Sequence, residues 1–443
     1  MNSLFIKVNE LRIFSKLQKL RNYTIIHIES IIIGVLFAMF VLGYTESLRW
    51  PLPIPKATHG LLKGLMVVLF ICIPFSHKFL TKVNHQTKNI LTSVFVLVNL
   101  VSALFTVATD TAILYLWYPF IVLAITYYFS RVIIRPKHFH IFIFISMTLV
   151  FLTFAFAFFS LMFRYSVDNL YYTLFITSRA NHLLDELKFV GKYVSLGPYI
   201  MLTPVCMYFL ISSQPIWRKI LSMFIYVLSV MTAVISNNRI DVAVIAFQSF
   251  VFLFLIPRKY IIIMVLIAIP VIQFGLYTTQ TYFGYNVAQR LFEPKKERDQ
   301  ESANMRWVYW GTALYNFRNS PIFGIGPNAY NDLSDFPTRK YFNEGPNGGY
   351  TLHRDLGIGV HNLFIERLSD TGLLGLSVFI AILFYFFRRD VLKVLQKENT
   401  KRSMYILFSL GSWTWILYGI TDNGYGAQGL VTFFVLRGMV DQI

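Results

Sequence analysis

Charged residues are scarce in this sequence of 443 residues: they make up 14% of it, whereas hydrophobic residues make up 56%. A soluble globular domain carries about 25% charged residues, so the composition argues against a soluble protein of this length. Acidic residues are the scarcer sign, with 22 Asp and Glu against 40 Lys and Arg. The cations gather in short segments between apolar runs, where they orient a membrane protein and meet anionic lipid, so their excess does not indicate nucleic-acid binding.

Cysteine is nearly absent, and several signatures of soluble enzymes are missing. Cys72 and Cys206 lie within apolar runs, which predicts buried thiols and leaves the redox compartment open. No small-residue cleavage site follows the first apolar run, so we expect no cleavable signal peptide. Gly324-Ile-Gly326 lacks the Lys-Ser/Thr and the strand-to-helix setting of a nucleotide loop. No His pair at metal-ligand spacing occurs in the segments expected outside, and no Gly-x-Ser-x-Gly occurs, so we expect no metal or cofactor.

Long apolar runs dominate the sequence instead. Because a helix needs about 20 apolar residues to cross a bilayer, the runs predict twelve spans, at about 24–44, 59–75, 89–107, 111–129, 139–162, 189–212, 220–236, 240–256, 260–277, 363–387, 403–420 and 425–441. The predicted fold is an all-α polytopic membrane protein with one large outer loop that contains short helices. Its parts are an N-terminal tail (1–23), nine spans (24–277), the large loop (278–362) and three spans with the C-terminus (363–443).

The basic residues predict the orientation of these spans. Alternate loops are rich in Lys and Arg and therefore face the cytoplasm, together with both termini; their cations include Lys78, Lys82, Lys88, Arg131, Arg135, Lys137, Arg218, Lys219, Arg258, Lys259, Arg388, Arg389, Lys393, Lys397, Lys401 and Arg402. The large loop, of mixed charge, falls on the opposite side. It contains a predicted amphipathic helix that begins at Ser302, ends before Ser320-Pro321, and carries Trp310, Leu314 and Phe317 on one face.

Three residues of the predicted outer side suit chemistry. Arg239 lies between two apolar runs with almost no loop; an arginine at a membrane edge indicates function, unless it pairs with Asp241 or reaches the headgroups. Arg306, on the loop helix, presents a planar guanidinium that suits phosphate oxygens, with a solvated helix residue as the alternative. His361 lies at the entrance of a predicted span, where an imidazole can act as a general base or simply bond backbone groups at a helix start.

The order of these motifs resembles the signature of a bacterial envelope family. His361-Asn362, nine residues, then Gly372-x-x-Gly375 is similar to the motif of the O-antigen ligase and polymerase superfamily. We expect the two glycines to mark close helix packing. The stretch from Arg306 to Pro327 resembles the large periplasmic loop of that family, and 236–239 resembles its short Ser-Arg turn, although two asparagines intervene here. The resemblance covers about residues 190–440.

The resemblance implies an enzyme of the bacterial inner membrane whose active site faces the periplasm. It would be a metal-independent, inverting glycosyltransferase that passes a glycan from undecaprenyl diphosphate to an acceptor hydroxyl. Carried onto this sequence, Arg239 and Arg306 would bind the diphosphate, and His361 would act at the acceptor hydroxyl or steady the leaving group.

Four further residues are weaker candidates for substrate binding within this resemblance. Arg290 competes with Arg306 for the diphosphate role, and Asn362 adjoins the histidine. Arg179 and His182 belong to a shorter outer loop at 163–188 and are candidates for contact with the glycan or the diphosphate, or for a solvated helix start.

Three functions remain to be distinguished. A ligase transfers finished polysaccharide to the lipid A–core oligosaccharide, whereas a polymerase joins lipid-linked repeat units. One dominant outer loop and the His-Asn-x9-Gly-x-x-Gly form favour an O-antigen ligase of lipopolysaccharide biosynthesis, although ligases of protein glycosylation share the signature. A transporter of lipid-linked sugars is the alternative from another class, but it should show charges deep in several spans and repeated halves, and here only Lys63 and Lys192 come close.

Overall fold

The computed structural model describes residues 86–106, 115–131, 196–212, 215–236, 239–256, 273, 296–331, 360–395, 399–421 and 426–443. This part of the chain is helical throughout and contains no strand. Its elements are α3 (Gln86–Leu104), α5 (Trp117–Arg131), α9 (Leu196–Ile211), α10 (Ile216–Ser236), α11 (Arg239–Leu253), α14 (Lys296–Asn319), the 3-10 helix η2 (Ala329–Asn331), α16 (Leu363–Leu395), α17 (Asn399–Thr421) and α18 (Gly426–Gln442). The predicted all-α class is therefore confirmed for the described residues.

Most of the predicted spans coincide with described helices. The helices α3, α5, α9, α10, α11, α16, α17 and α18 occupy eight of the predicted apolar segments, with ends that differ by a few residues. The segments 24–44, 59–75, 139–162 and 260–277 lie outside the described residues apart from residue 273, so the number twelve stays a prediction. By length and composition, α3 and α16 are the two described helices that can cross a membrane, and α9 and α11 contain shorter apolar helices.

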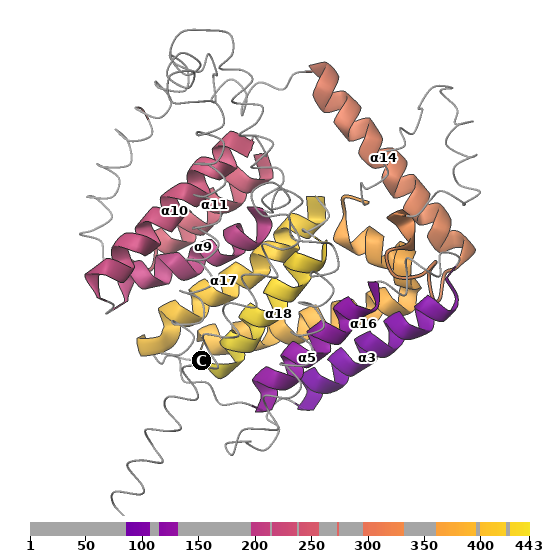
Figure 1. Ribbon diagram of the computed structural model, residues 1–443, viewed down its shortest axis with the longest axis horizontal. Coiled ribbons are helices and arrows are strands. Elements are labelled where there is room, and N and C mark those ends of the chain that lie inside the picture. The colour runs from indigo at the N-terminus through magenta and orange to yellow at the C-terminus, as the bar shows by residue number, and fades with distance from the viewer. Residues whose placement is uncertain are drawn as a thin grey trace, which may run out of the picture.

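Three helices form the centre of the bundle. The helices α9 and α18 pack on α17, while α3, α5, α10, α11 and α16 surround them. Figure 1 shows α17 and α18 in yellow between the magenta helices α9 to α11 and the indigo helices α3 and α5. Every residue of 429–440 in α18 is buried, as are Ile200 to Met207 in α9. A helix that is apolar on every face must be covered on every face, which accounts for the central position of these segments.

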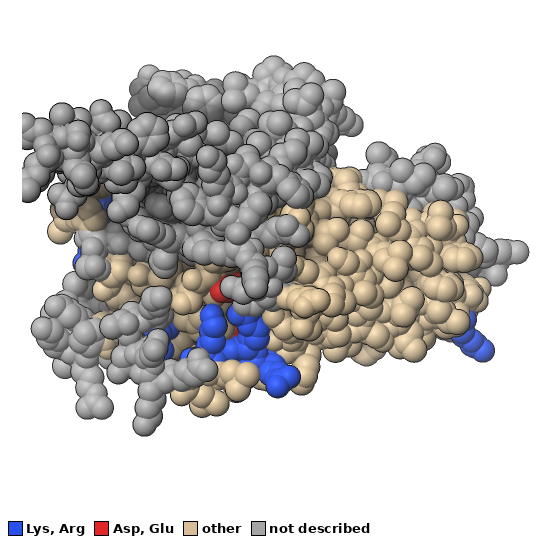
Figure 2. Space-filling view, turned by 90° about the horizontal axis from the view of Figure 1, so that it is seen from below, with Lys and Arg blue, Asp and Glu red and all other residues tan. Residues whose placement is uncertain are grey.

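The surrounding helices present apolar side chains outward. Ile220 of α10, Phe254 just beyond α11 and Phe384 of α16 are exposed by 64%, 74% and 64%. Figure 2 shows a wide face of the described part with almost no Lys, Arg, Asp or Glu. Soluble proteins rarely expose large contiguous apolar surfaces. The outward faces therefore suit an environment of lipid, as predicted from composition.

The helix α16 differs from the predicted span at 363–387, because it is broken at Gly372 and extends to Leu395. Gly372 has φ 65° and ψ −166°, outside the helical region. The break divides α16 into a short segment, Leu363–Thr371, and a long apolar segment that follows it. The long segment is by itself long and apolar enough to cross a membrane. The short segment carries Glu366, Arg367 and Asp370, and its end lies beside the loop that follows α14.

Candidate active site

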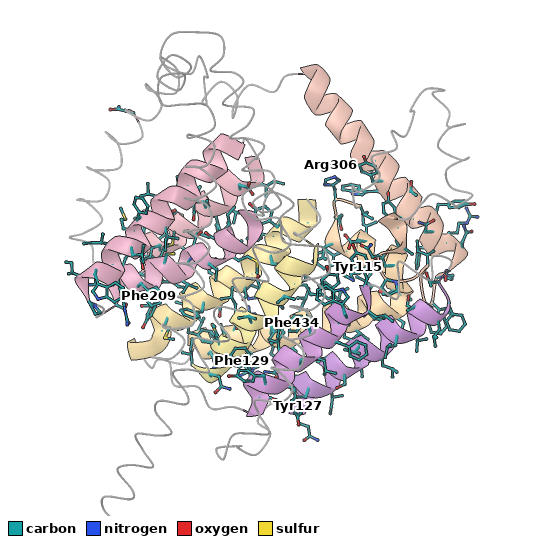
Figure 3. All side chains as sticks on the ribbon, viewed as in Figure 1. Tyr115, Tyr127, Phe129, Phe209, Arg306 and Phe434 are labelled. Carbon is teal, nitrogen blue, oxygen red and sulfur yellow. The ribbon has the colours of Figure 1, made fainter. Side chains whose placement is uncertain are left out.

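The loop helix α14 is joined to the bundle by a small apolar core of its own. Tyr309 and Ala313 of α14 pack with Ile325, Ala329, Tyr330 and Val360, all buried. The Tyr330 hydroxyl donates a hydrogen bond to the Tyr309 carbonyl at 3.2 Å. Burial raises the pKa of the Tyr330 phenol, which keeps this donor protonated. Figure 3 shows α14, with Arg306 labelled near its middle, reaching beyond the bundle.

The sequence predicted this helix but misplaced its start and its buried face. It begins at Lys296 rather than near Ser302, and it ends at Asn319 as predicted. Leu314, expected on the apolar face with Trp310 and Phe317, is 48% exposed. The buried stripe consists of Tyr309, Thr312, Ala313 and Asn316, which have the i, i+3, i+4, i+7 spacing of one helix face. The buried face of α14 is the one against which the following loop packs. Composition alone does not predict which face that is.

The loop after α14 bonds directly to the break in α16 through main-chain groups. The Ile325 and Gly326 N–H groups donate to the Ser369 and Asp370 carbonyls at 3.0 and 2.9 Å. In the opposite direction, the Leu373 and Leu374 N–H groups donate to the Pro321 and Ile322 carbonyls at 2.9 and 3.3 Å. These four bonds satisfy backbone groups that the break leaves without helical partners. They also fix loop 320–326 against α16.

Glycines permit this contact. A Cβ on Gly372 would lie 2.3 Å from the Ile322 oxygen, and one on Gly324 would lie 2.4 Å from the Asp370 oxygen. Both glycines have positive φ, which disfavours any side chain there. The expectation that Gly372 and Gly375 mark close helix packing is therefore corrected. Gly372 admits the loop backbone, and a Cβ on Gly375 would meet the side chain of Thr371 one turn earlier in the same helix.

The end of α3 holds the same junction from another side. Its Ser102 hydroxyl donates to the Asp370 carbonyl at 2.8 Å, and the Thr106 hydroxyl, just beyond the helix, donates to the Ile325 carbonyl at 2.7 Å. The Asp370 carboxylate in turn accepts the Asn328 N–H at 2.9 Å. Three separate segments of the chain thus meet at the break in α16, next to the first turns of that helix.

His361 is held at the start of α16 in a left-handed conformation, with φ 56°. The next residue, Asn362, caps the helix: its Oδ1 accepts the N–H groups of Phe364 and Ile365, both at 3.0 Å. The Asn362 Nδ2 donates to the Ile420 carbonyl of α17 at 2.9 Å. Asn362, predicted to bind substrate, therefore has both ends of its amide engaged in positioning the histidine. The imidazole lies beside the Tyr309 ring, with centroids 5.8 Å apart and planes 30° apart.

The contact between Tyr309 and His361 brings α14, the helix that carries Arg306, next to the histidine. Arg306 lies one helical turn before Tyr309, so the two side chains leave α14 on neighbouring positions. Arg306 is half-buried, and it makes no ion pair with the described residues. Its guanidinium is a permanent charge that the described part of the site leaves uncompensated. The structure therefore places His361 beside α14, one helical turn from Arg306 along that helix.

The start of α11, which is Arg239, lies at the same end of the bundle as the start of α16, and both adjoin α17. It is the first residue of α11, and its side chain lies outside the described part of the chain. Two residues later, the buried Asp241 accepts a hydrogen bond from the Tyr418 hydroxyl of α17. In the next residue of α17, a Cβ on Gly419 would lie 2.7 Å from the Leu363 side chain, so α16 starts against that turn. The starts of α11 and α16 therefore meet the last turn of α17 together.

Two charged residues near His361 were not among the residues predicted from the sequence. Glu366 and Arg367 lie in the short segment of α16, with side chains 15% and 13% exposed and 3.9 Å between Oε1 and Nη2. The signal in the sequence that could have indicated these two residues is their position, five and six residues after His361 at the start of a helix. Arg290, Arg179 and His182 lie outside the described residues, so their roles remain predictions. Within the described ranges, no group of three or more His, Cys, Asp or Glu is placed to hold a metal ion.

Comparison with known proteins supports the resemblance seen in the sequence. Residues 224–380 match the family described as O-Antigen ligase. The matched segment runs from α10 into α16 and includes Arg239, Arg306 and His361. It supports the O-antigen ligase superfamily, a family of membrane proteins, and does not separate ligases from polymerases. No curated protein matches the chain.

Proposed function

We propose that this protein is an O-antigen ligase, which transfers polysaccharide from undecaprenyl diphosphate to the lipid A–core oligosaccharide at the periplasmic face of the inner membrane. The observation that supports the proposal is that the helices carrying Arg239, Arg306 and His361 are neighbours in the fold. The starts of α11 and α16 meet the last turn of α17, and α14 joins them through the contact between Tyr309 and His361. In the proposal, two arginines and one imidazole act at this end of the bundle, and all three residues lie within the segment that matches the family.

The chemistry of the transfer requires such a set. Cleavage of the glycosidic bond leaves negative charge on the diphosphate, and fixed cations stabilise the charge that develops there. Arg306 and Arg239 take this role in the proposal, because guanidinium groups bind phosphate oxygens in pairs and keep their charge at every physiological pH. His361 accepts the proton of the acceptor hydroxyl as it attacks the anomeric carbon. The attack inverts that carbon and needs no metal ion.

Trp307 provides a surface for the glycan in this proposal. Its side chain is 68% exposed, directly after Arg306, and its ring meets Trp310 edge-on with centroids 5.3 Å apart. Tyr330, another aromatic residue of the same loop, is instead buried in the small core. An exposed indole offers a flat apolar face to the C–H groups of a sugar ring.

The test is made in the host, with the gene deleted and restored. The lipopolysaccharide is separated on a gel in strains that carry the wild type, His361→Ala, Arg306→Ala or the control Arg318→Ala, an exposed residue of the same helix. We expect bare core, with polymer accumulating on undecaprenyl diphosphate, in the deletion and in the first two variants, because loss of a general base lowers a rate by about 10²–10⁴-fold. The control should restore the ladder.

Other outcomes assign the protein differently. Core that carries a single repeat unit in the deletion strain identifies a polymerase, for which a second lipid-linked repeat unit is the acceptor. Unchanged lipopolysaccharide in the deletion strain contradicts both functions. Full activity of His361→Ala and Arg306→Ala at normal protein levels contradicts the proposal that these two residues form the active site.

A further inference from the structure

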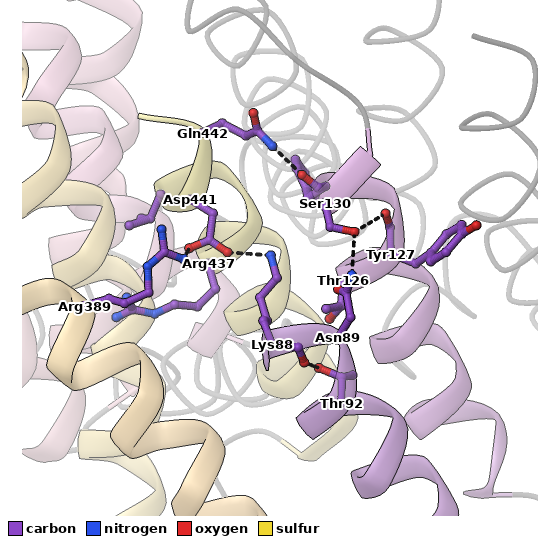
Figure 4. Close-up of polar contacts among 12 residues, drawn as sticks. Lys88, Asn89, Thr92, Thr126, Tyr127, Ser130, Arg389, Arg437, Asp441 and Gln442 are labelled. Atoms are coloured by element: carbon purple, nitrogen blue, oxygen red, sulfur yellow. Dashed lines mark hydrogen bonds and ion pairs between the residues drawn. The ribbon is translucent and has the colours of Figure 1, made fainter. Parts of the chain in front are cut away.

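Largely buried carboxyl groups at the two ends of the bundle have different partners. Asp441 of α18 pairs with Lys88 of α3 at 2.5 Å and with Arg389 of α16, and Figure 4 shows its carboxylate between these two cations. These ion pairs join three helices and therefore have a structural role. Glu366, at the other end, pairs with the adjacent residue of its own helix, Arg367, with 3.9 Å between Oε1 and Nη2. A pair between neighbours in one helix joins no elements, so helix packing does not account for this carboxyl group.

The start of α16 places Glu366 across from His361. Asn362 is the N-cap of the helix, since its Oδ1 accepts the N–H groups of Phe364 and Ile365. His361 is therefore the residue before the cap, and Glu366 is the fourth residue after it. The Glu366 N–H donates to the Asn362 carbonyl at 2.9 Å, which continues the helix from the cap. Side chains at these two positions often pack against each other, and when both are apolar the contact is called a hydrophobic staple. Here the same positions hold an imidazole and a carboxyl group.

Charge couples the same two side chains. The Glu366 side chain is 15% exposed. Burial raises the pKa of its carboxyl group, and the positive charges of Arg367 and of protonated His361 oppose that rise. Opposite charges attract more strongly where little water reaches them, because the effective dielectric constant is lower there. The Glu366 carboxylate and a positively charged imidazole therefore stabilise each other.

The next carboxyl group along α16 faces another partner. Asp370 Oδ2 accepts the Asn328 N–H at 2.9 Å, so this side chain is directed at the loop before η2. Burial and the negative charge of Glu366 raise the pKa of the Asp370 carboxyl, which favours its protonated form. Asparagine resembles that form in shape and keeps an oxygen for the Asn328 N–H. Asp370→Asn is therefore a matched control for the loss of a carboxyl group from this segment.

We propose that Glu366 is a positioning residue for the transfer: its carboxylate holds the His361 imidazole in the orientation that meets the acceptor hydroxyl and stabilises the imidazolium that forms. The inference rests on the proposed function, in which His361 is the general base. The hydroxyl proton passes to the imidazole while the hydroxyl oxygen forms the new bond to the anomeric carbon. The bond from that carbon to the diphosphate breaks, and its electron pair leaves on the diphosphate. The imidazolium later releases its proton to water, and Glu366 forms no bond to the substrate.

The experiment compares full-length enzymes purified in detergent. The donor is the undecaprenyl-diphosphate-linked glycan isolated from the deletion strain. The acceptor is the one that the phenotype of this strain identifies, namely bare lipid A–core for a ligase or a lipid-linked repeat unit for a polymerase. Initial rates at varied donor and acceptor concentrations give kcat and KM for each variant, and thermal unfolding shows whether each variant is folded.

The expected loss is in turnover. Glu366→Gln keeps the size of the side chain and removes its charge, so kcat should fall at least about 10-fold, as part of the about 10²–10⁴-fold that a general base contributes. The KM values should change little, because the imidazolium forms only during the reaction. Glu366→Asp restores a carboxylate with a shorter reach and should recover part of the rate. Asp370→Asn should keep a kcat close to that of the wild type.

A double variant distinguishes a role through His361 from a structural role. Residual transfer by His361→Ala and by His361→Ala/Glu366→Gln is measured over long incubations with excess enzyme. Because Glu366 acts through the imidazole, its substitution should cause no further loss once the imidazole is absent. A structural role would instead lower the residual rate by the same factor as in the wild-type background.

The outcomes separate this inference from the function on which it rests. A wild-type kcat in Glu366→Gln, when His361→Ala has lost activity, overturns the role of Glu366 and leaves the proposed function standing. A full further loss in the double variant, or an equal loss in Asp370→Asn, also overturns it. Full activity of His361→Ala contradicts the proposed function and this inference together. If Glu366→Gln does not fold, Glu366→Asp replaces it, and a wild-type kcat in that variant overturns the inference.

Discussion

At the end of the bundle that carries Asp390 and Asp441, the helices are joined by side-chain ion pairs, and cations from α3, α16 and α18 converge on two carboxylates. At the end that carries His361, the segments are joined by main-chain hydrogen bonds between loop 320–326 and the break in α16, and by glycines that permit close approach. At the first end, charged side chains are therefore engaged in ion pairs that hold the helices together. The second is held by main-chain groups, and Arg306 makes no ion pair with the described residues.

This difference indicates which residues tolerate substitution at each end. Where ion pairs provide the cohesion, removal of one partner leaves the other charge buried and unmatched. Where main-chain bonds provide it, side chains can be changed with less effect on folding, and the sensitive positions are the glycines and the caps. Stability and activity should therefore separate along the length of the molecule.

The largest expected effect follows from removal of a buried carboxylate. Asp390→Ala leaves the Arg437 guanidinium without its partner and should lower the free energy of unfolding by about 3–5 kcal/mol. Intrinsic fluorescence during thermal unfolding in detergent measures this change. The double variant Asp390→Ala/Arg437→Met should recover much of the loss, because it removes both charges together. If Asp390→Ala alone unfolds at the wild-type temperature, ion pairs do not hold together the end of the bundle that carries Asp390 and Asp441.

A smaller effect on stability, with a large effect on transfer, is expected at the break in α16. Gly372→Ala places a Cβ against the Ile322 carbonyl, and its backbone conformation alone costs about 1–3 kcal/mol for a residue other than glycine. Loop 320–326 should detach from α16, while the end of the bundle that carries Asp390 and Asp441 should stay folded. Hydrogen exchange of peptides from 320–331, beside an assay of lipopolysaccharide, measures this separation.

The matched control is Gly311→Ala, an exposed glycine within α14. Alanine favours a helix interior by about 0.5–1 kcal/mol over glycine, so this variant should be as stable as the wild type or slightly more so. Equal protection of loop 320–331 in Gly372→Ala and Gly311→Ala would show that the break in α16 is not what holds the loop.

The smallest expected effect concerns the cap of α16. Asn362→Ala removes an N-cap of about 1 kcal/mol and the bond to Ile420, so the first turn of the helix should exchange faster and the turnover rate of transfer should fall, with little change in apparent donor affinity. Asn362→Asp keeps the oxygen that caps the helix and loses the Nδ2 donor, and it should retain an intermediate rate. Unchanged donor turnover in Asn362→Ala would exclude a role for this cap in positioning His361.

The sequence predicted the helices and the family because both depend on local patterns. Apolar runs of sufficient length predicted α3, α9 and α17, and the spacing of His361, Gly372 and Gly375 indicated the family. The charge network was missed, although Arg437 and Asp441 lie inside the predicted span at 425–441, and charges within a span are themselves a signal. Their partners are far away in the sequence, Asp390 for Arg437 and Lys88 and Arg389 for Asp441, so no local pattern pairs them.

Composition and apolar runs alone predicted an all-helical chain with helices long and apolar enough to cross a membrane, because burial in lipid selects residues one segment at a time. Tertiary structure alone decided which face of α14 is buried, why Gly372 must be glycine, and that the starts of α11 and α16 meet at the last turn of α17. These features depend on contacts between segments remote in the chain, and the free energy of such contacts is fixed only when the helices pack.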